Sequence, residues 1–135
     1  MSDAAATPPR HQKGQYTGLD RVIRASKHSW DGFVRAYRDE SAFRQEVWLA
    51  VILMPLAFAL GRTWQDIALL IGSVALVLIT ELLNSAVEAA VDRISLDWHD
   101  LTKKAKDIGS AAVLLALLLC LGIWAAALWS RFFTH

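Results

Sequence analysis

The chain has 135 residues, of which 55% are hydrophobic, and a net charge of +1. Its length suits one domain, its mean hydropathy of +0.33 favours a membrane protein, and its near-neutral charge gives no indication of a nucleic-acid partner, so none is expected. The single cysteine, Cys120, excludes an intrachain disulfide and a cysteine metal site.

The first forty residues are polar. Residues 1–17 combine Ala, Thr, Pro and Gly with scattered charge, which predicts a disordered tail and shows no apolar stretch of a signal peptide. Residues 18–135 are predicted to form one membrane domain. Within it, residues 18–40 predict an amphipathic helix in the membrane interface, because apolar side chains recur every three or four positions opposite a basic face.

Three apolar runs follow, and they predict transmembrane helices at about residues 43–62, 66–91 and 107–130. The fold class is therefore an all-α membrane protein, with an N-terminal interfacial helix and three spans. A charged junction, with Glu40 and Glu46, joins the interfacial helix to the first span. This junction is expected at headgroup depth, which makes both carboxylates candidate functional groups.

Basic residues set the expected orientation. Eight lysines and arginines precede the first span and four lie between the second and third, against one in each of the other two non-membrane segments. The positive-inside rule places the N-terminus and the second loop in the cytoplasm and the C-terminus on the opposite side. The expected location is the inner (cytoplasmic) membrane.

The second span carries a polar face near its end. Glu81, Asn84, Ser85, Glu88 and Asp92 recur at helical spacing, and Glu81 and Glu88 point the same way, roughly 10 Å apart along the axis. A carboxylate at the centre of a membrane helix costs about 3 kcal/mol on insertion scales, so a functional requirement is expected to keep it there.

Depth distinguishes the two glutamates. With Asp92 at the water side, Glu88 lies about 6 Å inward and Glu81 about 16 Å inward. Glu88 can therefore meet a soluble, charged ligand, whereas Glu81 can meet a group that only a lipid brings, such as a hydroxyl at the acyl boundary. A proton acceptor is the chemistry that suits Glu81 at that depth.

Phosphate-binding loops of known type are absent from the sequence, which has no GxxxxGK[ST] and no GxGxxG. A nucleotide would have to be held by basic side chains and by carboxylates that bridge a metal. Glu40 and Glu88 suit a hard cation such as Mg²⁺. The lysines and Asp107 that precede the third span could hold phosphates, although lysines beside a span are also the ordinary orientation signal.

Several motifs together resemble the small integral-membrane diacylglycerol kinases of bacteria. The central one is Glu81-x-x-Asn84-Ser85-x-x-Glu88-x-x-x-Asp92, followed by Lys106-Asp107-x-Gly109-Ser110-Ala111. The others are Arg21-Val22-Ile23-Arg24-Ala25, Ser29-Trp30-x-Gly32 and Glu40-x-Ala42-Phe43-Arg44-Gln45-Glu46. The resemblance extends from about Gly18 to Ser130.

The resemblance implies transfer of the γ-phosphate of MgATP to the hydroxyl of diacylglycerol, giving phosphatidic acid, by a homotrimer whose active sites are shared between subunits. It implies that Glu81 is the base with Asn84 beside it, and that Glu40 and Glu88 bind Mg²⁺. The residues implied at the nucleotide are Arg21, His28, Glu40, Glu88, Asp97, His99, Lys106 and Asp107. The residues implied on the lipid side are Arg21, Ser29, Trp30, Glu46, Glu81 and Ser110.

Two other functions remain open from the sequence. A sister group of these kinases phosphorylates undecaprenol with the same carboxylate face. A small oligomeric ion or proton transporter would also place carboxylates inside a membrane helix. A purely structural membrane subunit would leave the buried glutamates unexplained.

Overall fold

The computed structural model describes residues 18–94 and 99–133, all of which are helical or in short connections. The predicted tail of residues 1–17 lies outside the described residues. The chain divides into two compact units, residues 1–32 and residues 33–135, which are described separately below. Helix α1 (Leu19–Asp39) begins in the first unit and ends in the second.

The first unit contains the start of α1. Gly18 precedes the helix with a φ of 71°, a left-handed conformation that favours glycine, and its carbonyl accepts a hydrogen bond from the Arg21 N–H. No residue of α1 is buried, and its apolar side chains, such as Leu19 and Trp30, are exposed. The helix therefore presents an uncovered apolar stripe, as expected of a helix that lies in an interface.

The second unit begins with the end of α1 and its junction to α2 (Ser41–Leu60). Glu40 alone separates the two helices, and its extended backbone (φ −105°, ψ 116°) allows the chain to change direction. The Arg44 guanidinium donates hydrogen bonds to the carbonyls of Tyr37 and Arg38 at 3.1 and 2.7 Å. Arg44 thus satisfies carbonyls that the end of α1 would leave unpaired.

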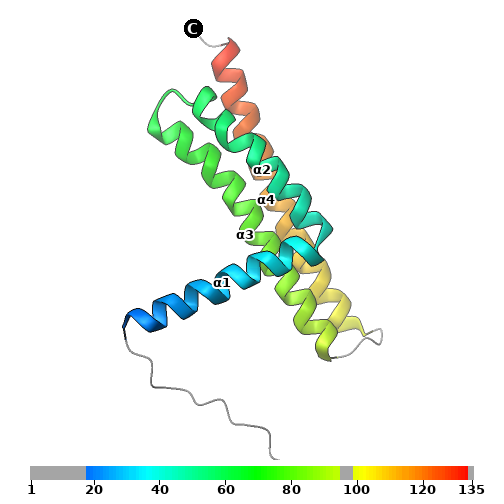
Figure 1. The fold of residues 1–135 in the computed structure, drawn as a ribbon. Helices are drawn as coiled ribbons and strands as arrows, with labels where there is room; N and C mark the ends of the chain where they lie inside the picture. The colour runs from blue at the N-terminus through cyan, green and yellow to red at the C-terminus, as the bar shows by residue number, and fades with distance from the viewer. Residues whose placement is uncertain (1–17, 95–98, 134–135) are drawn as a thin grey trace, which may run out of the picture. The chain divides into compact units, whose positions relative to one another are not determined.

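Three helices, α2, α3 (Trp64–Ile94) and α4 (Asp100–Phe133), are each long and apolar enough to cross a membrane. In Figure 1, α3 lies beside both α2 and α4, and most helix contacts of the unit involve α3. Helix α2 continues through Pro55. The prediction of an all-α protein with three apolar spans is confirmed.

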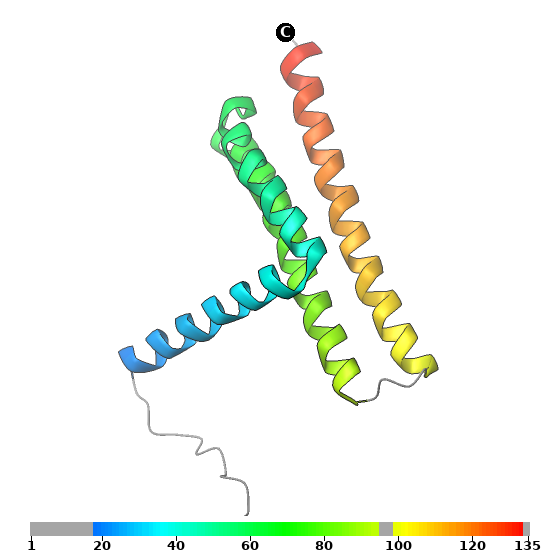
Figure 2. The same ribbon diagram turned by 45° about the vertical axis from the view of Figure 1, so that its right-hand side comes forward.

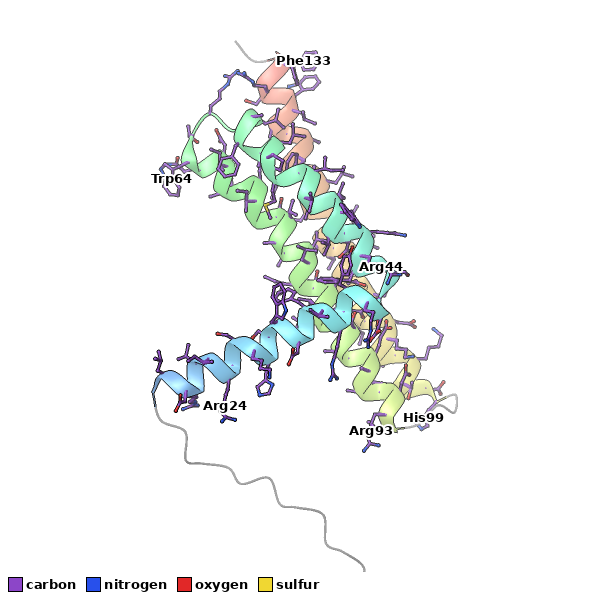
Figure 3. The ribbon with its side chains drawn as sticks, in the orientation of Figure 1. Arg24, Arg44, Trp64, Arg93, His99 and Phe133 are labelled. Atoms are coloured by element: carbon purple, nitrogen blue, oxygen red, sulfur yellow. The ribbon has the colours of Figure 1, made fainter. Side chains whose placement is uncertain are left out.

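The turn between α2 and α3 is held by a reciprocal cap. Asp66 accepts hydrogen bonds from the N–H groups of Arg62 and Thr63 at 3.1 and 3.0 Å, and the Thr63 hydroxyl accepts one from the Asp66 N–H. Figure 3 shows Trp64 and Phe133 at this end of the three helices and Arg93 and His99 at the other. Trp64 and Phe133 therefore mark one end of the three helices, where Arg62 and Arg131 also lie, and Arg93 and His99 mark the other.

Helix α4 begins at Asp100, about seven residues before the predicted span (Figure 2). The imidazole Nδ1 of His99 accepts a hydrogen bond from the Leu101 N–H at 3.2 Å, and Lys103 and Asp107 form an ion pair one turn apart. These polar contacts add helical turns that hydropathy does not detect, because they stabilise the helix without any apolar residue.

The packed core lies in the half of the bundle nearer the α2–α3 turn. Its buried members are Ala50, Ala57, Leu70, Val74 and Trp124. Small residues on α2 allow close approach of the helix backbones, which favours association of helices inside a membrane. The other half of the bundle holds polar side chains instead.

Candidate active site

Three helices surround a cavity of about 600 Å³ in the half of the bundle nearer Arg93. We call it the carboxylate cavity. Its lining comes from Glu40 in the α1–α2 junction, from the start of α2 (Ala42, Gln45, Glu46 and Leu49), from α3 (Glu81, Asn84, Ser85 and Glu88) and from α4 (Ser110, Val113 and Leu117). Six of the predicted site residues are therefore brought together: Glu40, Glu46, Glu81, Asn84, Glu88 and Ser110.

The helix geometry explains which α3 residues reach the cavity. Glu81, Asn84, Ser85 and Glu88 follow steps of three and four, so they share the face that α3 turns toward the start of α2. Leu83 and Val87 lie on another face and line a separate apolar groove. The polar face of α3 therefore lines the carboxylate cavity, and an apolar face lines the groove.

Glu81 is the most enclosed carboxylate of the cavity. It is only 6% exposed, although it carries an ionisable group inside a membrane helix. Glu46 reaches the same cavity from α2, and its Oε2 atom is buried with no hydrogen-bond partner among the described residues. Buried polar atoms without partners are rare in folded proteins, so these groups are expected to meet a substrate, an ion or a proton.

The charge of the cavity is one-sided. Among the described residues, its lining includes four carboxylates and no lysine, arginine or histidine. Like charges at close range in a poorly solvated site are unfavourable unless cations or protons compensate them. The cavity is therefore suited to a cation, or to an anionic ligand that arrives with a cation.

Asn84 contacts the shallower glutamate. Its Nδ2 donates a hydrogen bond to Oε1 of Glu88 at 3.1 Å, one helical turn further along α3. The sequence places Asn84 beside the base, whereas its hydrogen bond in the structure is made to Glu88. Its catalytic role stays a prediction.

The other predicted nucleotide residues of this unit that the structure describes, His99, Lys106 and Asp107, do not line the cavity. Lys106 on α4 pairs with Asp92 on α3, with 2.7 Å between Nζ and Oδ1. Asp107 pairs with Lys103, and His99 caps the start of α4. Both ion pairs are solvent-exposed, so their basic groups remain within reach of a soluble ligand.

The described residues would supply only some of the ligands of a metal ion in this cavity. In the described ranges, 18–94 and 99–133, no three His, Cys, Asp or Glu side chains converge to hold an ion. Glu40, in the α1–α2 junction, and Glu88, on α3, nevertheless line one cavity. A hard cation that takes its remaining ligands from water and phosphate oxygens fits this donor set, since Mg²⁺ is usually held by one or two carboxylates.

Five further predicted positions are not tested by this cavity. Arg21, His28, Ser29 and Trp30 belong to the first unit, where the Ser29 hydroxyl donates to the Ala25 carbonyl at 3.0 Å. Asp97 lies outside the described residues. Their assignment to the nucleotide or the lipid stays a prediction.

Three residues near the site had no role from the sequence. Gln45 and Ser85 line the carboxylate cavity, and Asp92 holds Lys106. The signal for Ser85 was its position on the same helix face as the two glutamates. Gln45 and Asp92 belong to quoted motifs, but their contacts could not be predicted, because those contacts depend on how separate helices pack.

Comparison with known proteins agrees with the motifs. Residues 27–128 match the family described as prokaryotic diacylglycerol kinase. The chain is 51% identical to the diacylglycerol kinase of Pseudomonas aeruginosa, covering 89% of this chain and 97% of that protein. It is 49% identical to the diacylglycerol kinase of Haemophilus influenzae, covering 83% of this chain and 95% of that protein. It is 46% identical to the diacylglycerol kinase of Escherichia coli K12, covering 86% of this chain and 95% of that protein. The chain therefore belongs to the prokaryotic diacylglycerol kinase family.

Proposed function

We propose that the chain is an ATP-dependent diacylglycerol kinase, which transfers the γ-phosphate of ATP to the free hydroxyl of diacylglycerol and releases ADP and phosphatidic acid. Family membership and relatives of that name over most of the chain support this function. The observation that carries it is Glu81, a carboxylate that is 6% exposed inside an apolar helix and that lines a cavity.

Glu81 is the proposed general base. The substrate hydroxyl oxygen attacks the γ-phosphorus and forms the new O–P bond, while Glu81 takes the hydroxyl proton. The bond between the γ-phosphorus and the bridging oxygen to the β-phosphate breaks, and ADP leaves with the electron pair. A base at this depth suits a lipid, because the acyl chains hold the hydroxyl near the membrane boundary.

Glu40 and Glu88 are the proposed ligands of Mg²⁺. Glu40 approaches from the α1–α2 junction and Glu88 from α3, and the four-carboxylate lining suits a divalent cation. When bound, Mg²⁺ would neutralise charge on the phosphates, which is most of what phosphoryl transfer requires besides positioning. Asn84 orients Glu88 through its hydrogen bond.

Basic residues must complete the site, because the cavity lining has none. Lys106 is the proposed phosphate contact of the second unit, with Asp107 and His99 nearby at the start of α4. Arg21, His28 and Asp97 are the other proposed nucleotide residues. Ser29 and Trp30, with Glu46 and Ser110 of the cavity, are proposed to contact the lipid.

The proposed assembly is a homotrimer with sites shared between subunits. Many large apolar side chains of α2 and α4, such as Trp48, Leu115 and Leu121, are more than half exposed, which leaves faces for lipid and for neighbouring copies. The proposed location is the inner (cytoplasmic) membrane with the N-terminus in the cytoplasm, since eight lysines and arginines precede the first span and four lie between the second and third, against one in each of the other two segments.

Phosphate transfer by the purified, detergent-solubilised chain tests the function. Radiolabelled MgATP is offered with diacylglycerol and, in parallel, with undecaprenol, and a Glu81→Gln chain is the control. We expect labelled phosphatidic acid from the native chain and almost none from the control.

Two other outcomes of this assay would change the proposed function. Preference for undecaprenol would keep the mechanism and change the substrate. If a folded, trimeric chain transfers phosphate to neither lipid, the kinase function is wrong, and cation flux through liposomes containing the chain becomes the measurement to make.

A further inference from the structure

Gly109 on α4 lies directly against Asn84 on α3. A Cβ atom built at Gly109 would overlap Oδ1 of Asn84 and would lie 3.3 Å from its Cγ. The three heavy atoms nearest to that Cβ all belong to Asn84. Only glycine therefore leaves the Asn84 carboxamide where it stands.

The orientation of the Asn84 carboxamide follows from its two neighbours. The side that meets Glu88 must be the NH₂ group, because a carboxylate oxygen can only accept. The carbonyl oxygen Oδ1 then faces the opposite way, toward Gly109. Oδ1 is buried and has no hydrogen-bond partner among the described residues. Space at Gly109, and not a hydrogen bond to Oδ1, is what permits this orientation.

We propose that Gly109 is a positioning residue for the proposed metal site. Because Gly109 has no side chain, it leaves room for Oδ1 of Asn84. Nδ2 of Asn84 can then donate its hydrogen bond to Glu88, and this bond holds the Glu88 carboxylate toward the cavity. Groups that orient a metal ligand commonly change metal affinity by about 10- to 100-fold when they are lost. The metal role rests on the proposed function, whereas the steric coupling of Gly109 to Asn84 does not.

The chain provides a matched control in the same helix. Gly122 also lies in α4, but a Cβ there would meet nothing within 4 Å. Gly109→Ala and Gly122→Ala add the same methyl group and give the same gain in helix propensity. A difference between them therefore reports the surroundings of Gly109 and not a general effect of removing glycine.

Binding of Mn²⁺, a paramagnetic substitute for Mg²⁺, is measured on purified chains with a non-hydrolysable ATP analogue. We expect Gly109→Ala to weaken Mn²⁺ binding by about 10- to 100-fold, and Gly122→Ala to bind as the native chain does. Native affinity in the Gly109→Ala chain would overturn the proposal.

A double-mutant cycle with Asn84→Ala separates positioning from packing. If Gly109 acts through Asn84, then adding Gly109→Ala to Asn84→Ala should weaken Mn²⁺ binding no further, since the overlapping atoms are gone. Losses that add in the double variant would show that Gly109 acts by another route. Should Gly109→Ala alone fail to assemble, Asn84→Ala should restore assembly, and failure of that rescue would also overturn the proposal.

Thermal unfolding is then measured without metal or nucleotide for the native chain, Gly109→Ala, Asn84→Ala and the double variant. This measurement separates the steric coupling of Gly109 to Asn84 from the proposed metal role. Destabilisation by Gly109→Ala that disappears in the Asn84→Ala background supports the steric coupling. If the native chain also binds no Mn²⁺, the coupling stands and the metal assignment of the proposed function fails.

Discussion

Asn84 and Glu88 form a hydrogen-bonded pair one turn apart on α3, with 3.1 Å between Nδ2 and Oε1. Both residues line the carboxylate cavity, as does Glu81, which lies less than one turn from Asn84 and nearly two turns from Glu88 along α3. Under the proposed function, a charged ligand would meet Glu88 and a lipid hydroxyl would meet Glu81 in the same cavity. The predictions below follow from that division.

Glu88→Gln should raise the Mg²⁺ concentration needed for half-maximal turnover, because the change removes a charged metal ligand while keeping the side-chain size. Ser85→Ala is the control, since Ser85 lines the same cavity without charge. The measurement is a Mg²⁺ titration of the rate at constant ATP. Identical titration curves for Glu88→Gln and the native chain would count against metal binding.

Glu81→Gln should lower the rate by roughly 10²–10⁴-fold, the range for losing a general base. Turnover at saturating MgATP and diacylglycerol is the measurement, with chromatographic size as a check on assembly. Glu46→Gln, in the same cavity, should chiefly change the KM for the lipid. Near-normal turnover of Glu81→Gln would remove Glu81 from its role.

Mixtures of Glu40→Ala and Glu81→Ala chains should recover part of the activity that each lacks alone, if sites are shared. Each variant keeps the group that the other has lost, so some sites in a mixed trimer are complete. Activity is measured after the two chains are unfolded and reassembled together. Complete inactivity of well-assembled mixtures would assign each site to one subunit.

Lys106→Met should raise the KM for ATP, because it removes a positive charge beside a cavity whose lining carries none. Its pairing with Asp92 is exposed, so the loss should change the free energy of unfolding by less than about 1 kcal/mol. Steady-state kinetics measure the KM for ATP, and thermal unfolding measures the change in stability. An unchanged KM for ATP would exclude Lys106 from nucleotide binding.

Ala57→Leu should destabilise the bundle by about 1–3 kcal/mol, because a larger side chain would be forced into a close helix contact. Ala57 is 0% exposed, whereas Ala59, two residues along α2, is exposed and provides the matched Ala59→Leu control. Thermal unfolding in detergent compares the two. Equal stability of both variants would contradict the packing of α2 against α3.

Much of the fold could be predicted from residues close together in the chain. Hydropathy locates the three spans, and the spacing of Glu81, Asn84 and Glu88 places them on one helix face. Helix ends were harder, because α4 begins at Asp100 through the His99 cap and the Lys103–Asp107 pair. Apolar content alone does not report such contacts.

For the site, too, some features follow from local sequence and others only from the packing of separate helices. By itself, the sequence determined that Glu81, Asn84, Ser85 and Glu88 share one helix face and how they are spaced along it, because helical periodicity and rise are local properties. Only the tertiary structure decided that Glu46 and Ser110 meet that face, that Asp92 holds Lys106, and that Gly109 leaves room for Asn84. These relationships depend on the axial rotation and register of separate helices, which packing between side chains distant in sequence sets.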